Sequence, residues 1–293
     1  MRRFAVPTRP AARSCRQVDI RPFPVGARMP TVEPTVSAGR FRCGRWTVSS
    51  SLEGSLVVED SVVRRIGVAS GITAAVLSIL WFVTFQAKDA IAPVPDWRDV
   101  EGYAAALSPW RTAYIYPSLL LALAYLALLA AVHVRVHGST RVWSLLAFAI
   151  GIVYATMASV NYTIQAVSVR WSLAAGETAG IEMFLPDNPR SIFGALALSY
   201  VYMGLSMAAL AFVFREGRLE RWIRWILLAQ LVSAVGQTAS TMFGAGDAVL
   251  IVTGLVWVVG APVAFVLMAR WFALPYGRAA SAATPRRAAR TGS

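Results

Sequence analysis

Long apolar runs dominate the pattern of hydrophobic and polar positions along the chain, and they are almost free of charge. A bilayer core about 30 Å thick needs about 20 apolar residues in helical form. Six runs meet this requirement: 66–86, 113–132, 142–169, 192–214, 222–243 and 248–268. Only Arg224 interrupts them, and it lies near enough to an end for its side chain to extend to the headgroups. The pattern predicts an all-α, polytopic membrane helix bundle with six transmembrane helices.

Basic residues indicate how these helices are oriented. The chain has 28 Lys and Arg against 15 Asp and Glu, a net charge of +13. Of the basic residues, 23 lie in segments 1–65, 133–141, 215–224 and 270–293, whereas the intervening loops hold five. Because Lys and Arg concentrate on the cytoplasmic side, we expect both termini to be cytoplasmic. Orientation accounts for the positive charge, so no nucleic-acid partner is expected.

Composition indicates the kind of membrane. The chain is 57% hydrophobic and 15% charged, whereas a typical soluble protein has about 25% charged residues. Lys88 is the only lysine in an Arg-, Ala- and Gly-rich sequence, which is typical of a GC-rich genome and indicates a bacterial plasma membrane. Cys15 and Cys43 precede the first run without the spacing of a metal or redox motif, so we expect no disulfide.

The segments outside the helices differ from the membrane domain. We expect three parts: an Arg- and Pro-rich disordered tail (1–61), the transmembrane domain (62–274) and a second disordered tail (275–293). Both tails are expected in the cytoplasm, where their arginines would contact anionic lipid. For the first tail, an alternative is a translation start downstream, at Met29 or a later codon.

Ionisable groups are missing from the middle of the predicted helices. No carboxylate, Lys or His lies there, which argues against a proton-coupled carrier and an intramembrane enzyme. His133 and His137 share a helical face, a spacing that can bind a metal, but no Cys or acidic residue adjoins them. We therefore expect solvated histidines, and no catalytic residue, cofactor or metal site.

Uncharged polar residues form stripes in two of the predicted helices. The third contains Tyr154, Asn161, Gln165 and Ser168 at spacings that share a face, and the fifth contains Gln230, Ser233, Gln237, Ser240 and Thr241. One hypothesis is an outward-facing polar pocket lined by Tyr116, Asn161, Gln165, Gln237 and Thr241. The alternative is that these groups hydrogen-bond helices together, each contributing about 0.6 to 2 kcal/mol.

Two predicted outer loops are long and acidic. Residues 87–112 include Asp89, Asp96, Asp99 and Glu101, and residues 170–191 include Glu177, Glu182 and Asp187. These loops form either a vestibule that attracts cations or ordinary solvated connections.

Three stretches carry a resemblance to known proteins. They are NYTIQ from Asn161, DNPRSIFGALALSYVYMGLSMAALAFVF from Asp187 and GRLERWIRWILLA from Gly217. Together they resemble a group of six-helix bacterial and archaeal integral membrane proteins of unknown function. The resemblance spans about residues 62–274 and implies the six-helix fold, without adding a catalytic residue.

Two classes of function are consistent with these patterns. The first is a structural or accessory membrane subunit, embedded in the lipid bilayer beside a membrane-protein partner. The alternative is a small-molecule binding or transport-related protein that uses the polar pocket. They differ in whether the polar stripes are packed dry or line a cavity.

Overall fold

Helices make up the part of the chain that the structure describes, and that part contains no strand. The structure is a computed structural model that describes residues 50–93, 97–186, 188, 191–192, 198–244 and 246–274. Within these ranges, only the backbone is described at 50–59, 241 and 247. The tail segments 1–49 and 275–293 lie outside the described residues.

Four helical stretches are long and apolar enough to cross a membrane. They are Asp60–Ile91, Pro109–Arg135, Thr140–Ala174 and Ala248–Ala273. A shorter apolar helix, Ser199–Ala211, lies within the fourth predicted run, and a 27-residue helix, Gly217–Phe243, covers the fifth. The membrane helix class is therefore confirmed, while the count of six crossings stays a prediction.

In chain order the described helices are α1 (Ser50–Ile91), α2 (Val100–Ala106), α3 (Pro109–Thr112), α4 (Ile115–Arg135), α5 (Thr140–Thr163), the π-helix η1 (Ile164–Val169), α6 (Arg170–Ala174), the 3₁₀-helix η2 (Glu182–Phe184), α8 (Ser199–Ala211), α9 (Gly217–Phe243) and α10 (Asp247–Ala273). The first helix begins at Ser50, inside the segment that the sequence assigns to a disordered tail. Hydropathy marks only the membrane-spanning part of a helix, and the Leu-, Val- and Glu-containing sequence before it favours continued helix.

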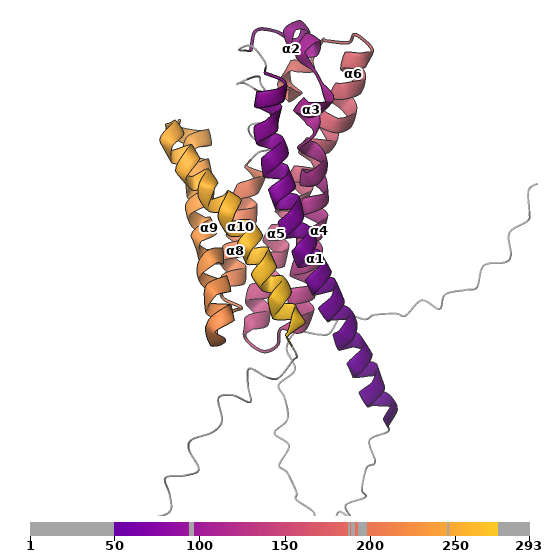
Figure 1. Ribbon diagram of the computed structural model, residues 1–293, viewed down its shortest axis with the longest axis vertical. Helices are drawn as coiled ribbons and strands as arrows, with labels where there is room; N and C mark the ends of the chain where they lie inside the picture. Colours follow the sequence, from indigo (N-terminus) through magenta and orange to yellow (C-terminus); the bar gives the residue numbers. More distant parts are fainter. Residues whose placement is uncertain are drawn as a thin grey trace, which may run out of the picture. The chain divides into compact units, whose positions relative to one another are not determined.

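The six longest helices form a closed ring. Each packs against the next in the order α1, α4, α5, α8, α9, α10, and α10 packs against α1 (Figure 1). Close approach is possible because glycines lie at the contacts. A Cβ at Gly71 of α1 would be 3.0 Å from the Phe265 carbonyl oxygen of α10, and one at Gly204 of α8 would be 3.0 Å from the Gln230 carbonyl oxygen of α9.

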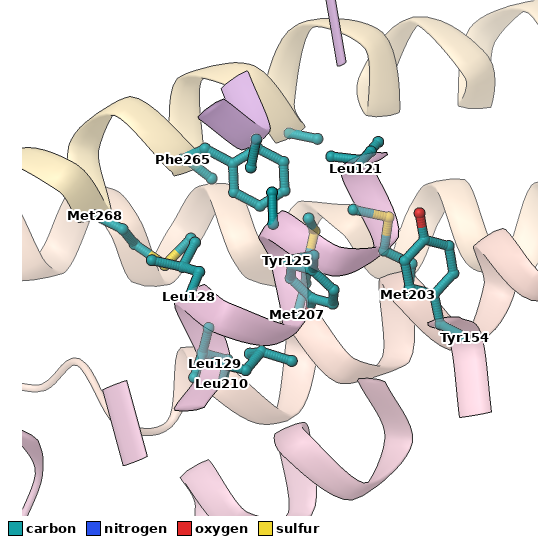
Figure 2. Packing of buried hydrophobic residues seen from close by; sticks show 14 of the residues in the cluster. Leu121, Tyr125, Leu128, Leu129, Tyr154, Met203, Met207, Leu210, Phe265 and Met268 are labelled. Atoms are coloured by element: carbon teal, nitrogen blue, oxygen red, sulfur yellow. The ribbon is translucent and has the colours of Figure 1, made fainter. Parts of the chain in front are cut away.

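Large side chains from four helices fill the centre of the ring. Figure 2 shows Tyr125 of α4 among Met203 and Met207 of α8 and Phe265 of α10, all fully buried. The Tyr125 hydroxyl donates to Ser206 Oγ at 2.7 Å, and Ser206 Oγ donates to the Ala147 carbonyl oxygen of α5 at 2.6 Å. A hydrogen-bonded chain thus joins α4, α8 and α5 inside an apolar core.

One end of the ring is tied together around Arg135, the last residue of α4. Its Nη1 donates to the Phe272 carbonyl oxygen at 3.0 Å, and its Nη2 donates to the Leu274 carbonyl oxygen at 3.1 Å. Its guanidinium carbon lies 4.2 Å from the centroid of the Trp271 ring. Arg135 therefore caps the carboxyl end of α10, where the helix dipole favours a cation.

Candidate functional site

The short helices between the long ones gather at the other end of the ring. We call residues 97–112 and 170–186, which contain α2, α3, α6 and η2, the cap (Figure 1). A cleft of about 800 Å³ opens in the cap. Its lining includes Trp97, Arg98, Asp99, Glu101, Glu182 and Asn188. The two acidic loops identified from the sequence therefore meet around one concave surface.

The cap has a small hydrophobic core of its own. Val100 and Tyr103 of α2 are buried with Val169 of η1 and Leu185, which follows η2. At the start of α2, Asp99 Oδ1 accepts a hydrogen bond from the Gly102 backbone N–H at 2.7 Å, an N-cap that fixes the helix beside the cleft. Because both walls of the cleft pack on this core, they are held in place, unlike freely solvated loops.

Gln165 anchors the cap to the ring. It lies in η1, is buried, and donates through Nε2 to the Phe184 carbonyl oxygen of η2. A π-helix is rare and often marks a functional position. The i→i+5 hydrogen bonding of this π-helix rotates the later residues around the helix axis. As a result, Ser168, the last member of the predicted polar stripe, is exposed and Val169 is buried in its place. The spacing rule for α-helices placed Ser168 on the buried face and was wrong at that residue.

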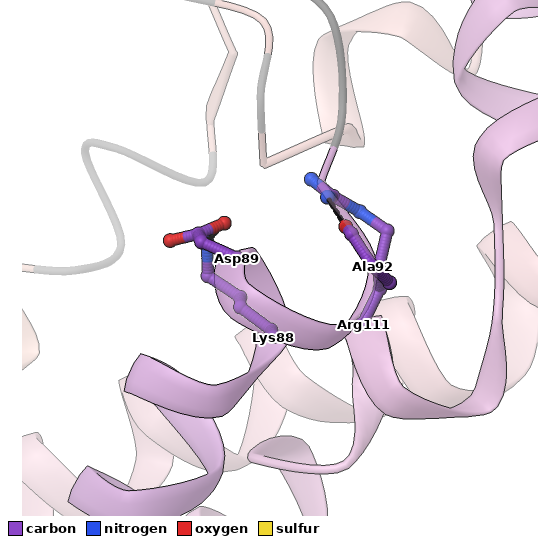
Figure 3. A network of polar contacts seen from close by, with 4 residues as sticks. All are labelled: Lys88, Asp89, Ala92 and Arg111. Atoms are coloured by element: carbon purple, nitrogen blue, oxygen red, sulfur yellow. Dashed lines mark hydrogen bonds and ion pairs between the residues drawn. The ribbon is translucent and has the colours of Figure 1, made fainter.

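Arg111 of α3 joins the cap to the end of α1. Its buried side chain donates from Nη1 to the Ala92 carbonyl oxygen at 2.8 Å, which ties α3 to the end of α1 (Figure 3). Nearby, Lys88 Nζ lies 2.7 Å from Asp89 Oδ1. The Asp89 side chain is 65% exposed, so this ion pair between adjacent residues contributes little to stability. Arg111, in contrast, fixes the base of the cap.

Charge on the cleft wall favours a positively charged ligand. Asp99, Glu101 and Glu182 contribute three carboxylates, and Arg98 contributes one guanidinium. Trp97 adds an aromatic surface in the same wall. Carboxylates together with an aromatic face are the groups that bind organic ammonium ions.

A column of aromatic rings connects the cap with the centre of the ring. We call this column the aromatic column; its members are Trp81, Phe85, Tyr114, Tyr154, Tyr162, Tyr200 and Trp257. Tyr114, just before α4, lies 6.2 Å from Tyr162 between ring centroids. The hydroxyls of Tyr162 and Tyr200 lie 3.0 Å apart and share a hydrogen bond. The column therefore places polar atoms inside the bundle directly below the cap.

Several polar atoms of this region are buried without a hydrogen-bond partner within the described residues. They include Trp81 Nε1, Tyr154 Oη, Ser199 Oγ and Trp257 Nε1, together with Gln230 Oε1 on α9. Each such group costs free energy when it is removed from water. The interior below the cap therefore contains polar atoms that do not contribute hydrogen bonds to the described fold.

The residues of the predicted polar pocket are not all in one place. Asn161 and Gln165 are buried on one face of α5 and η1, whereas Tyr116 on α4 is 51% exposed. Gln237 is half-buried on α9, and α8 lies between α5 and α9 in the ring. The Thr241 side chain lies outside the described residues. Binding by this set stays a prediction.

Some of the predicted polar residues are used in packing between helices. Gln230 Nε2 is 3.4 Å from the Val256 carbonyl oxygen of α10, and Thr253 of α10 occupies the space where a Cβ at Gly236 would lie. Within the α9 stripe, Gln230 therefore contacts α10, while the choice between a pocket and helix packing for the stripe as a whole stays open.

Metal ligands do not gather anywhere in the described parts of the chain: no group of three or more His, Cys, Asp or Glu is close enough to hold an ion. His133 instead pairs through Nδ1 with Ser144 Oγ at 2.9 Å, and Ser144 Oγ donates to the Arg141 carbonyl oxygen. The half-buried His133 thus links α4 to α5.

Sequence reasoning missed the cap core and the aromatic column. The tyrosines of the column lie inside apolar runs at no common period, because they come from different helices. The acidic loops were the only signal for the cleft. No protein-family model, curated protein or solved structure matches the chain, so the resemblance noted in the sequence assigns no family.

Proposed function

We propose that the chain is a membrane protein that binds a small, positively charged solute in the cleft of its cap. The observation that carries this proposal is the cleft of about 800 Å³ with walls fixed by a core of their own. A pre-formed concave site with a few polar groups is the usual form of a small-molecule site. Three carboxylates and Trp97 in the wall select a cation over an anion or a neutral solute.

The proposal includes an orientation of the chain. Six crossings place α1, α4, α5, α8, α9 and α10 across the membrane, with both termini in the cytoplasm and the cap outside. The low count of basic residues in the cap loops supports this orientation, and the Arg- and Ala-rich composition supports a bacterial plasma membrane. In this orientation the cleft is open to solutes on the outside of the cell.

Thermal unfolding of the purified full-length chain in detergent tests the binding site. Tetramethylammonium chloride and 1,4-diaminobutane hydrochloride serve as probes, with sodium chloride at equal ionic strength as the reference. A ligand that binds only the folded state raises the melting temperature by mass action. We expect at least one of the two amines to raise it above the sodium chloride reference, with saturation.

Two matched double variants decide whether the cleft is responsible. Glu101→Gln with Glu182→Gln removes two carboxylates from the wall and should abolish the amine-induced shift. Glu177→Gln with Glu216→Gln removes two exposed carboxylates outside the lining and should keep it. Equal loss in both variants, or no shift with either amine in the unchanged protein, would overturn the proposal.

The accessory-subunit alternative is favoured by one observation, the use of Gln230 and Thr253 in packing α9 against α10. It predicts that a second membrane protein is recovered in a fixed ratio when the chain is purified in mild detergent. It also predicts that removal of this partner lowers the melting temperature while the amines have no effect.

A further inference from the structure

The surroundings of Arg224 on α9 favour the binding of an anion. It lies seven residues after Gly217, where α9 begins, and its side chain is half-buried. Its Nε is buried and has no hydrogen-bond acceptor within the described residues. Its guanidinium carbon lies 5.9 Å from the centroid of the Phe212 ring, at the end of α8. Leaving the buried Nε donor of this half-buried guanidinium without an acceptor costs free energy.

The nearest carboxylate in sequence is already engaged elsewhere. Glu220 Oε1 accepts from Trp271 Nε1 at 3.0 Å, and Glu220 Oε2 accepts from the backbone N–H groups of Arg215 and Glu216 at 3.1 and 2.8 Å. The ion pair found within the described residues joins Lys88 and Asp89, beside the cap. The protein itself therefore supplies Arg224 with no described carboxylate.

The exposed face of α9 that adjoins Arg224 through Arg221, three residues earlier, is basic and aromatic. Arg218, Arg221, Trp222 and Trp225 are exposed and share one face of α9, at the i, i+3, i+4 and i+7 spacing. Trp222 is 58% exposed and Trp225 is 62% exposed. With a rise of 1.5 Å per residue, this face extends about 10 Å along the helix. Tryptophan side chains of this kind sit at the level of lipid headgroups.

Aromatic contacts extend the same surface to a third helix. The Phe212 ring beneath Arg224 packs against Trp143 of α5, with 4.6 Å between the ring centroids. A molecule that contacts Arg221 and Arg224 from the outside therefore lies against apolar rings from α5 and α8 on one side, with Trp225 of α9, four residues after Arg221, on the other. A hydrated ion gains nothing from such rings, whereas a lipid places its headgroup at the arginines and its acyl chains along the apolar surface.

We propose that the beginning of α9 is a binding site for an anionic phospholipid, with Arg221 and Arg224 donating hydrogen bonds to the headgroup phosphate. Arginine suits this role because its planar guanidinium binds phosphate through two parallel hydrogen bonds. The exposed Trp225 lies on the same face of α9 as Arg221, beside the lipid at the membrane interface. The site is at the opposite end of the ring from the cleft and does not depend on ligand binding there.

Lipid-dependent thermal stability of the full-length chain tests the site. The melting temperature is measured in detergent with added dioleoyl-phosphatidylglycerol, with dioleoyl-phosphatidylcholine, or with inorganic phosphate. We expect phosphatidylglycerol to raise the melting temperature more than phosphatidylcholine does, and phosphate to have no effect. A shift of the same size with phosphate alone would show a site for the free ion and would overturn the lipid proposal.

Charge-matched variants separate this site from general attraction between a basic protein and anionic lipid. Arg221→Gln with Arg224→Gln should lose more than half of the phosphatidylglycerol shift. Arg64→Gln with Arg65→Gln removes two exposed arginines from α1 and should keep it. If both variants lose the same part of the phosphatidylglycerol-induced rise in melting temperature, only net charge matters. If the Arg221→Gln, Arg224→Gln variant keeps the full rise, α9 has no role. Either result refutes the site.

Arg221→Lys with Arg224→Lys keeps the charge and covers the case in which the glutamine variant fails to fold. Lysine binds phosphate as a point charge, without the planar pair of donors. We expect this variant to retain fewer phosphatidylglycerol molecules than the unchanged chain when both are released from mixed micelles in a native mass spectrometer. Equal retention of phosphatidylglycerol and phosphatidylcholine by the unchanged chain would contradict the proposal.

Discussion

Tyr125 and Ser206 form a 2.7 Å hydrogen bond between side chains that are both fully buried at the centre of the helix ring. Ser206 Oγ in turn donates a hydrogen bond to the Ala147 carbonyl oxygen, so one serine is the partner of a donor on α4 and of an acceptor on α5. In an apolar core, a donor left without its acceptor costs about 1 to 3 kcal/mol. The two residues are therefore expected to be energetically coupled.

A double-mutant cycle measures that coupling. Ser206→Ala leaves the Tyr125 hydroxyl without its acceptor, so we expect it to lower the free energy of unfolding by about 1 to 3 kcal/mol. Tyr125→Phe removes only one donor and should cost less, near the 0.6 kcal/mol average for hydrogen bonds between membrane helices. With both changes the loss should be smaller than the sum. Additivity within about 0.5 kcal/mol, in unfolding by denaturant in detergent, would show that the residues act independently.

Close packing of α1 against α10 leads to a second prediction, at Gly71. A Cβ there would be 3.0 Å from both the Ala269 Cβ and the Phe265 carbonyl oxygen, and the carbonyl belongs to a backbone that cannot easily move. Gly71→Ala should therefore lower the free energy of unfolding by about 1 to 3 kcal/mol. Gly254→Ala is the control, because nothing lies within 4 Å of its Cβ, and it should be neutral or stabilising. Equal effects of the two changes would argue against the contact.

The helix class was predictable from the sequence because lipid imposes a simple rule. Apolar runs of about 20 residues must form helices, and the runs around Ala75, Leu128 and Val258 do so. The same rule gave no information on where α1 begins, because the helix continues past the apolar run to Ser50. Propensity and capping, which are weak signals, decide that boundary.

The candidate site was less predictable because it depends on contacts between distant segments. The acidic residues Glu101 and Glu182 pointed to two loops, but their meeting in one cleft depends on Val100 and Leu185 packing together. The polar stripe was correct from Tyr154 to Gln165, the second residue of the π-helix. After Gln165 the change in helix geometry placed Val169, instead of Ser168, on the buried face. A fixed helical period cannot anticipate such a change.

The hydrogen bond from Gln165 to the Phe184 carbonyl oxygen is expected to hold the cap on the ring. Gln165→Leu leaves that carbonyl without its donor, at a cost of about 1 to 3 kcal/mol. We expect the backbone amides of residues 181–185 to exchange with deuterium about tenfold faster, with little change in α4. Ser168→Ala, in the exposed position of the same π-helix, is the control. Unchanged exchange in the Leu variant would mean that the hydrophobic core of the cap suffices.

The capping role of Arg135 gives a fourth prediction, at the opposite end. Arg135→Gln removes the charged donor of the Phe272 and Leu274 carbonyl oxygens and the contact with Trp271. Hydrogen bonds to charged groups contribute about 1.5 to 3 kcal/mol, so the free energy of unfolding should fall within that range. Arg135→Lys should recover only part of the loss, since lysine lacks the fork geometry. Arg141→Gln, at an exposed position on α5, should change stability little; a loss as large as that at Arg135 would indicate a general charge effect.

The orientation of the chain can be tested crossing by crossing with single cysteines. The starting variant is Cys15→Ser with Cys43→Ser, and single cysteines are then introduced at exposed positions. The positions are Ser139 before α5, Glu177 between α5 and α8, Glu216 between α8 and α9, and Gly246 after α9. Because basic residues are rare in the cap loops and frequent in the opposite loops, a membrane-impermeant maleimide should label the Glu177 and Gly246 variants in intact cells. The Ser139 and Glu216 variants should be labelled only after permeabilisation. The reverse labelling pattern would mean that the protein has the opposite orientation in the membrane. Equal labelling at Glu177 and Glu216 would mean that α8 does not cross, which leaves fewer than six membrane-spanning helices.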